Sequence, residues 1–83
     1  MGSPDDLAQA TTEDLAALAE AAISLLAERA DPEAFGHLLR LTRIVGEGVG
    51  VAARATAQRG SWAGVADIAG TSRQAAWERW RTP

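Results

Sequence analysis

The sequence predicts an all-α protein, a small helical bundle of about four helices with a C-terminal helix-turn-helix. Apolar side chains recur at steps of three and four residues through 11–31 and 32–60, which is the period of an amphipathic helix. Residues that cap or break helices stand at the ends of both stretches. Residues 61–81 then form two short helical segments separated by a tight turn. We therefore expect a flexible tail over 1–10 and a single helical domain over 11–83.

The predicted tail is polar and shows no sustained apolar period. After it, Thr11 or Thr12 can cap a helix that runs to about Ala30, with Asp14 at the spacing of a capping box. This helix has a broad apolar face, formed by Leu15, Leu18, Ala19, Ala22, Ile23, Leu26 and Ala30. A broad apolar face is stable only when it packs against another apolar surface. Packing within one chain and a seam between two chains both remain open.

A long central helix follows. Asp31 is a cap, Pro32 suits the first turn, and Gly60 ends the helix after about Arg59. Two apolar faces flank a narrow polar stripe. One face consists of Phe35, Leu38, Leu39, Thr42, Val45, Val49, Ala52 and Ala53; the other consists of Leu41, Ile44, Gly48, Val51 and Ala55. One face can hold the helix-turn-helix, and the other needs a second cover from the N-terminal helix of the same chain or of a partner chain.

Gly46, Gly48 and Gly50 stand in the middle of the central helix, where each costs about 0.5 to 1 kcal/mol relative to alanine. Their spacing matches neither a phosphate-binding loop nor the dinucleotide fingerprint, so we do not expect nucleotide binding. Gly46 and Gly50 share a face, which indicates a close crossing with another helix. A kink or break of the helix is the alternative.

A domain of 83 residues buries only about 60 to 65% of the surface that its unfolded chain exposes. Many of its apolar residues are alanines, whose burial removes little area. Both facts favour a homodimer. The residues expected at its interface are Leu15, Leu18, Ile23, Leu26, Leu41, Ile44, Gly48 and Val51.

The C-terminal segment is organised by three cap signals. Ser61 can cap a first helix to Ala69, Gly70 supplies a left-handed residue that ends it, and Ser72 can cap a second helix from Arg73. The expected inner residues are Val65, Ala66 and Ala69 of the first helix and Ala76, Trp77 and Trp80 of the second, with Trp62 also in the core. Trp77 can equally lie exposed, which would suggest a protein contact.

Ala66, Gly70 and the run from Ser72 to Gln74 carry a resemblance to a known family. They fall where helix-turn-helix regulators of the lactose-repressor type keep a small residue, a turn glycine and the start of the recognition helix. The segment, about a quarter of the chain, is also similar to the C-terminal helix-turn-helix of small, arginine-rich actinobacterial regulators. There a tryptophan opens the first helix and a run like SRQAA opens the second. The resemblance implies a DNA-binding regulator.

The charge is divided unevenly along the chain. Residues 1–34 carry eight acidic residues against one arginine, whereas residues 35–83 carry seven arginines against three acidic residues. An acidic part that faces away from DNA and a basic part that faces it would give this pattern, as would a chance imbalance on a solvated surface.

Double-stranded DNA is therefore the expected partner. Arg73 and Gln74 lie in the first turn of the second short helix, and they match the side chains that pair with guanine and adenine. Glu78 could accept from a cytosine amino group or pair with Arg81 or Arg54. The phosphate contacts expected are Ser61, Thr71, Ser72, Arg54, Arg59 and Arg81.

Other classes of function find little support. There is no cysteine and His37 is the single histidine, so we expect no metal, no cofactor and no catalytic residue. No apolar stretch is long enough to span a membrane, and we expect a soluble cytoplasmic protein. The alternative function is a helix-turn-helix used as a protein-interaction or assembly module that does not bind DNA.

Overall fold

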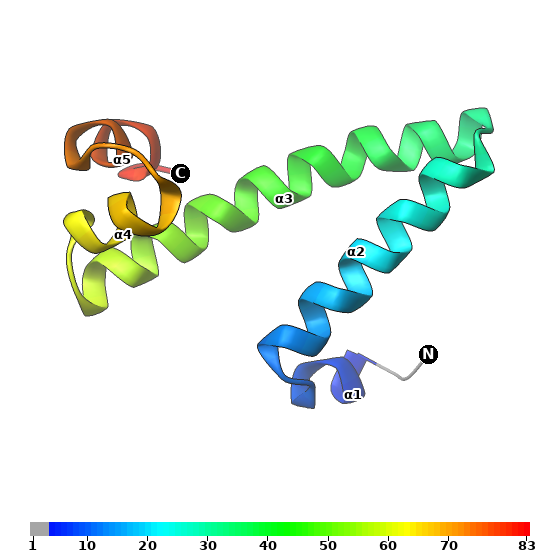
Figure 1. Cartoon of the computed structure of the whole chain (residues 1–83), viewed down its shortest axis with the longest axis horizontal. Coiled ribbons are helices and arrows are strands. Elements are labelled where there is room, and N and C mark those ends of the chain that lie inside the picture. Colours follow the sequence, from blue (N-terminus) through cyan, green and yellow to red (C-terminus); the bar gives the residue numbers. More distant parts are fainter. Residues whose placement is uncertain (1–3) are drawn as a thin grey trace. The chain divides into compact units, whose positions relative to one another are not determined.

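The computed structural model describes residues 4–83, and in them the fold is all-α, as predicted (Figure 1). The five helices of these residues are α1 (Pro4–Gln9), α2 (Thr12–Arg29), α3 (Pro32–Arg59), α4 (Trp62–Ala69) and α5 (Arg73–Trp80). The chain separates into two compact units, Met1–Arg40 and Leu41–Pro83, called unit 1 and unit 2 below. Their boundary falls inside α3, so this one helix belongs to both units.

Helix α1 lies where a flexible tail was expected. Pro4 stands at its first position, where the missing N–H costs no hydrogen bond, and the backbone N–H of Ala10 donates to the oxygen of Leu7 at 3.1 Å. The expectation relied on the absence of a sustained apolar period, and a helix of six residues is too short to show one. Residues 1–3 of the predicted tail lie outside the described residues.

The predicted caps of α2 and α3 are confirmed. The Thr11 hydroxyl accepts a hydrogen bond from the backbone N–H of Asp14 at 3.1 Å, and the Asp31 carboxylate accepts one from that of Ala34 at 2.7 Å. These side chains satisfy backbone donors that have no partner within a helix. Between the two helices, Ala30 adopts a left-handed conformation with φ of 54°, which an alanine rarely takes.

Helix α3 runs unbroken for 28 residues through all three glycines, so the break considered above is wrong. Around Gly46 and Gly48 a Cβ atom would meet nothing within 4 Å, so neither glycine is needed for a close approach. Around Gly50 a Cβ atom would lie 3.1 Å from Nη1 of Arg54. The close approach at Gly50 is therefore made by a side chain of the same helix.

Unit 2 contains a small core built mainly from alanines. Its buried members are Ala53 of α3, Val65 and Ala66 of α4, and Ala76 of α5, and the partly buried Ala57, Trp62 and Trp80 pack against them. Ala76 has no exposed surface, and Ala66 keeps only 3%. These two small residues allow α4 and α5 to approach closely, as expected. Ala69, predicted on the inner face, is exposed.

Unit 1 is organised differently. Among its described residues only Ala34 is buried, and α2 contains no buried residue at all. The apolar face that the sequence predicts for α2 is thus present but open.

Candidate nucleic-acid interface

The turn between α4 and α5 is fixed by three local devices. The Ser61 hydroxyl accepts from the backbone N–H of Gly64 at 3.0 Å, which starts α4. Gly70 takes the left-handed conformation with φ of 71°, and the backbone N–H of Thr71 donates to the oxygen of Ala66 at 3.0 Å. The bond from Thr71 is the six-to-one bond of a Schellman cap, and the N–H of Gly70 donates to the same Ala66 oxygen. The chain therefore turns directly after α4. The predicted helix-turn-helix signals are confirmed here.

Helix α5 begins immediately after this turn. The Ser72 hydroxyl accepts from the backbone N–H of Ala75 at 3.1 Å, which leaves Arg73 and Gln74 in the first helical turn. Both side chains are exposed, as are those of Thr71 and Ser72. Four predicted DNA contacts therefore share one edge of unit 2. Because the hydroxyls of Ser72 and Ser61 accept from backbone N–H groups, each keeps its O–H proton to donate.

Glu78 has a different partner from those expected. Its Oε1 accepts a hydrogen bond from Nε2 of Gln74 at 3.0 Å, one turn away along α5. It pairs with neither Arg81 nor Arg54, because residues four apart on a helix are neighbours and Gln74 is within reach. The contact orients the Gln74 amide and leaves the amide oxygen and one N–H available.

Arg54, predicted to contact phosphate, makes a hydrogen bond within unit 2. Its Nη1 donates to the backbone oxygen of Trp80 at 3.1 Å, and the side chain is half-buried. Trp80 ends α5, where carbonyl oxygens lack helical partners and carry a partial negative charge. Arg54 therefore ties α3 to the end of α5, and it does not stand among the exposed phosphate candidates.

Two other arginines lie over tryptophan rings. The guanidinium carbon of Arg81 is 4.5 Å from the centre of the Trp77 ring, and that of Arg79 is 5.1 Å from the centre of the Trp80 ring. Both distances suit a cation–π contact. Trp77 keeps 38% of its surface exposed, so of the two positions considered it takes the exposed one. Arg59 is exposed in the last turn of α3.

The charge of unit 2 suits an anionic partner. It holds six arginines against three acidic residues, whereas unit 1 holds two arginines against eight acidic residues. The basic excess thus falls on the unit that carries α4 and α5.

The residues predicted for a dimer interface are spread over both units. Leu15, Leu18 and Ile23 of α2 keep 37 to 44% of their surface exposed, and on α3 Ile44 keeps 44% and Val51 62%. Leu26 and Leu41 are half-buried, and Gly48 is exposed. Most of these side chains are open to a further contact.

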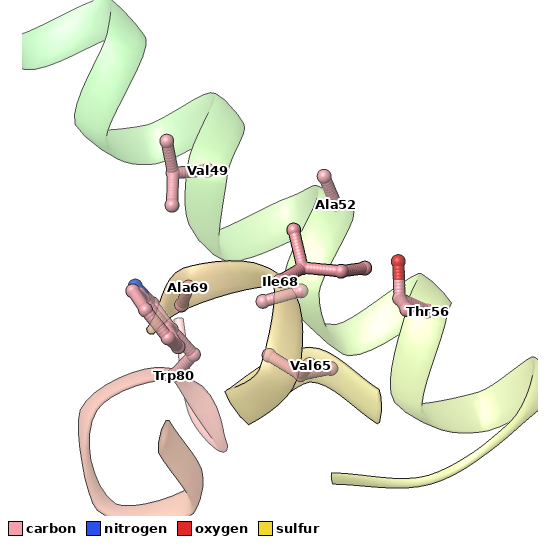
Figure 2. A pocket seen from close by; sticks show the side chains of 8 residues that line it. Val49, Ala52, Thr56, Val65, Ile68, Ala69 and Trp80 are labelled. Atoms are coloured by element: carbon pink, nitrogen blue, oxygen red, sulfur yellow. The ribbon is translucent and has the colours of Figure 1, made fainter. Parts of the chain in front are cut away.

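Sequence reasoning missed an apolar cleft in unit 2, shown in Figure 2. Helices α3 and α4 form its walls and Trp80 of α5 lies at one side. It is lined by Val49, Ala52, Ala53, Thr56, Val65, Ile68, Ala69 and Trp80. Ile68 is 81% exposed. The sequence contained one indication of this cleft. Ile68 is a large apolar residue of α4 that stands beside the predicted inner face, so it has no predicted packing partner.

Within residues 4–83, no group of three or more His, Cys, Asp or Glu side chains is placed to hold a metal ion. His37 Nε2 lies 3.9 Å from a carboxylate oxygen of Glu33, in an exposed pair on α3. None of the helices described is long and apolar enough to cross a membrane.

Comparison of the chain with protein-family models, with curated proteins and with solved structures found no match.

Proposed function

We propose that the protein is a sequence-specific DNA-binding transcriptional regulator that inserts α5 into the major groove. One observation carries this proposal: a capped turn at Gly70 presents Arg73 and Gln74, both exposed, in the first turn of a short helix. The first turn of a recognition helix is the part that meets base edges.

The side chains at this edge suit distinct contacts. Arg73 can donate two hydrogen bonds to O6 and N7 of guanine, and Gln74 can pair with N6 and N7 of adenine. The hydrogen bond from Gln74 to Glu78 would restrict the amide before DNA arrives, which lowers the entropy lost on binding. Thr71, Ser72 and Ser61 would reach phosphates, together with Arg59 and Arg81.

The charge of unit 2 supports the same proposal, because its basic excess would attract the DNA backbone. A homodimer would place two copies of α5 in successive major grooves, about 34 Å apart, on an inverted repeat. The open apolar side chains of α2 and α3 supply a reason for two copies to associate.

The test is fluorescence anisotropy against a pool of random duplexes, with the bound fraction sequenced and the titration repeated across a salt series. A sequence-specific dimer would enrich a two-fold symmetric motif, and its affinity would fall steeply as salt rises. Absence of binding at low salt would contradict the proposal.

Two variants separate base contacts from phosphate contacts. Arg73→Ala should cost about 1 to 3 kcal/mol of binding free energy and relax the preference at one base pair of each half-site. Arg59→Ala should weaken all sequences alike. An unchanged sequence preference in Arg73→Ala would remove this residue from base recognition.

A second candidate function is a protein-interaction module, and the exposure of Ile68 and Trp77 favours it. Apolar docking surfaces bind with little dependence on salt, whereas phosphate contacts lose affinity steeply. The same salt series therefore distinguishes the two functions.

A further inference from the structure

The apolar cleft of unit 2 has room for a side chain from outside the unit. Its volume is about 190 Å³. A cavity of roughly 150 Å³ lined by aliphatic side chains already accepts a benzene molecule. The side chains around the cleft are almost entirely hydrocarbon, with Thr56 and the indole nitrogen of Trp80 as the polar groups drawn in Figure 2. An apolar side chain would therefore fill it better than water.

The surroundings of the cleft are apolar on one side and basic on the other. Ile68 contributes the largest exposed fraction among the large apolar residues of the described chain, 81%. Past Val49 and Trp80, a second hollow is lined in part by Arg54 and Arg79, against Glu47 as the one acidic side chain. A helix with an apolar stripe and acidic residues beside it would suit this surface. The stripe would contact the apolar cleft, and the acidic residues would face the arginines.

Helix α2 has this composition. It has no buried residue, and Leu15 and Leu18 lie on its apolar face with 41% and 44% of their surface exposed. Asp14 stands four residues before Leu18 and so lies on the same side of the helix. Unit 1, which contains α2, has eight acidic residues against two arginines, whereas unit 2 has six arginines against three acidic residues. Pairing two acidic units would be repulsive, and pairing unit 1 with unit 2 would be attractive.

The length of α2 argues that it comes from a second copy. Its 18 residues measure about 27 Å, and Ala30 and Asp31 connect it to the start of α3. Folded back along α3 of its own chain, it would end level with about residue 50. Of the cleft residues on α3, Val49 lies just within that level, whereas Ala52, Ala53 and Thr56 lie beyond it. A second copy has no such restriction.

We propose that α2 of one copy docks its apolar face, with Leu18 at the centre, into the apolar cleft beside Ile68 of a second copy. The exchange is reciprocal, so each copy gives one helix and accepts one, which closes a two-fold symmetric dimer. This inference rests on the homodimer of the proposed function and is independent of DNA binding.

The test uses the absence of cysteine from the sequence. Leu18→Cys and Ile68→Cys are made in separate chains, one with an added tag that changes its mass, and are mixed with a short bis-maleimide cross-linker. Cysteine is itself a small apolar residue, so both sites keep their character. Ala63→Cys is the matched control, because Ala63 is exposed on α4 and does not line the cleft. Leu15→Cys replaces Leu18→Cys if circular dichroism shows that helicity is lost.

The expected result is a covalent heterodimer of Leu18→Cys with Ile68→Cys, and little of it with Ala63→Cys. Three results would overturn the proposal. One is the absence of the heterodimer when a further variant, with Leu18→Cys and Ile68→Cys in the same chain, cross-links within that chain. The others are cross-linking of Leu18→Cys to itself alone and an equal yield with Ala63→Cys. Molar mass from light scattering separates the failures. A dimer without the heterodimer cross-link leaves the proposed homodimer standing, whereas a monomer overturns both.

Discussion

The two units of the chain use the same kinds of residue and bury them very differently. Unit 2 closes a core around Ala53, Val65, Ala66 and Ala76, while unit 1 buries only Ala34 among its described residues. Unit 1 nevertheless has the larger aliphatic side chains on α2, none of them buried. Apolar content therefore does not decide burial in this protein. Small residues where two helices cross allow the close approach that burial needs.

Local structure does not distinguish the units. Thr11 and Asp31 cap the helices of unit 1 with the same side-chain-to-backbone hydrogen bonds that Ser61 and Ser72 make in unit 2. The difference arises after the helices form. In unit 2 a tight turn at Gly70 forces α4 and α5 together, and Arg54 of α3 binds the end of α5.

The largest expected effect is at the helix crossing of unit 2. Ala76→Leu adds three side-chain carbons where no surface is exposed, so the free energy of unfolding should fall by about 1 to 3 kcal/mol. The neighbouring Ala75 is exposed, and Ala75→Leu should change stability by less than about 0.5 kcal/mol. Urea unfolding monitored by tryptophan fluorescence measures both. Equal effects of the two variants would contradict the core described for unit 2.

The next effect concerns the contact between α3 and α5. Arg54→Ala removes the hydrogen bond to the Trp80 oxygen and should cost about 1 to 2 kcal/mol of unfolding free energy. Arg59→Ala, an exposed arginine of the same helix, should leave stability nearly unchanged. Thermal unfolding followed by circular dichroism compares them. If both variants have the same free energy of unfolding, the hydrogen bond from Arg54 does not stabilise the position of α5. The side chain would then be free for the phosphate contact that the sequence predicts.

A smaller effect separates two glycines of α3. Gly46→Ala should stabilise the helix by about 0.5 to 1 kcal/mol, since the new Cβ meets nothing within 4 Å. Gly50→Ala should gain less or lose stability, because its Cβ would lie 3.1 Å from the Arg54 guanidinium that binds Trp80. Urea unfolding of the two variants gives the difference directly. A loss of stability in Gly46→Ala would favour the close helix crossing that the glycine spacing suggested.

The smallest effect lies in unit 1. Ala30 has φ of 54°, a conformation that costs an alanine more than a glycine. Ala30→Gly should therefore raise the free energy of unfolding by about 0.5 kcal/mol, after the entropy that glycine loses on folding is deducted. Thermal unfolding at matched protein concentration is the measurement. A decrease would show that the turn between α2 and α3 does not need the left-handed conformation.

The candidate site was predictable in its local part. Short-range hydrogen bonding determines the caps at Ser61 and Ser72, the turn at Gly70 and the exposed first turn of α5. The residue types at these positions are enough to predict it. The partners of longer side chains were not predictable. Gln74 donates a hydrogen bond to Glu78, and Arg54 donates one to the Trp80 oxygen. Such partners depend on which atoms the folded chain brings within hydrogen-bond distance.

By itself, the sequence determined where α2 to α5 begin and end, the turn that joins α4 to α5, and the division of charge between the two halves. Helix caps, glycine conformation and charge are properties of residues and their near neighbours, so they can be read without a fold. Only the tertiary structure decided that Arg54 is half-buried against the end of α5, that Trp77 and Ile68 are exposed, and that an apolar cleft remains beside Trp80. These depend on contacts between residues far apart in the chain, and no local pattern encodes the geometry of such contacts.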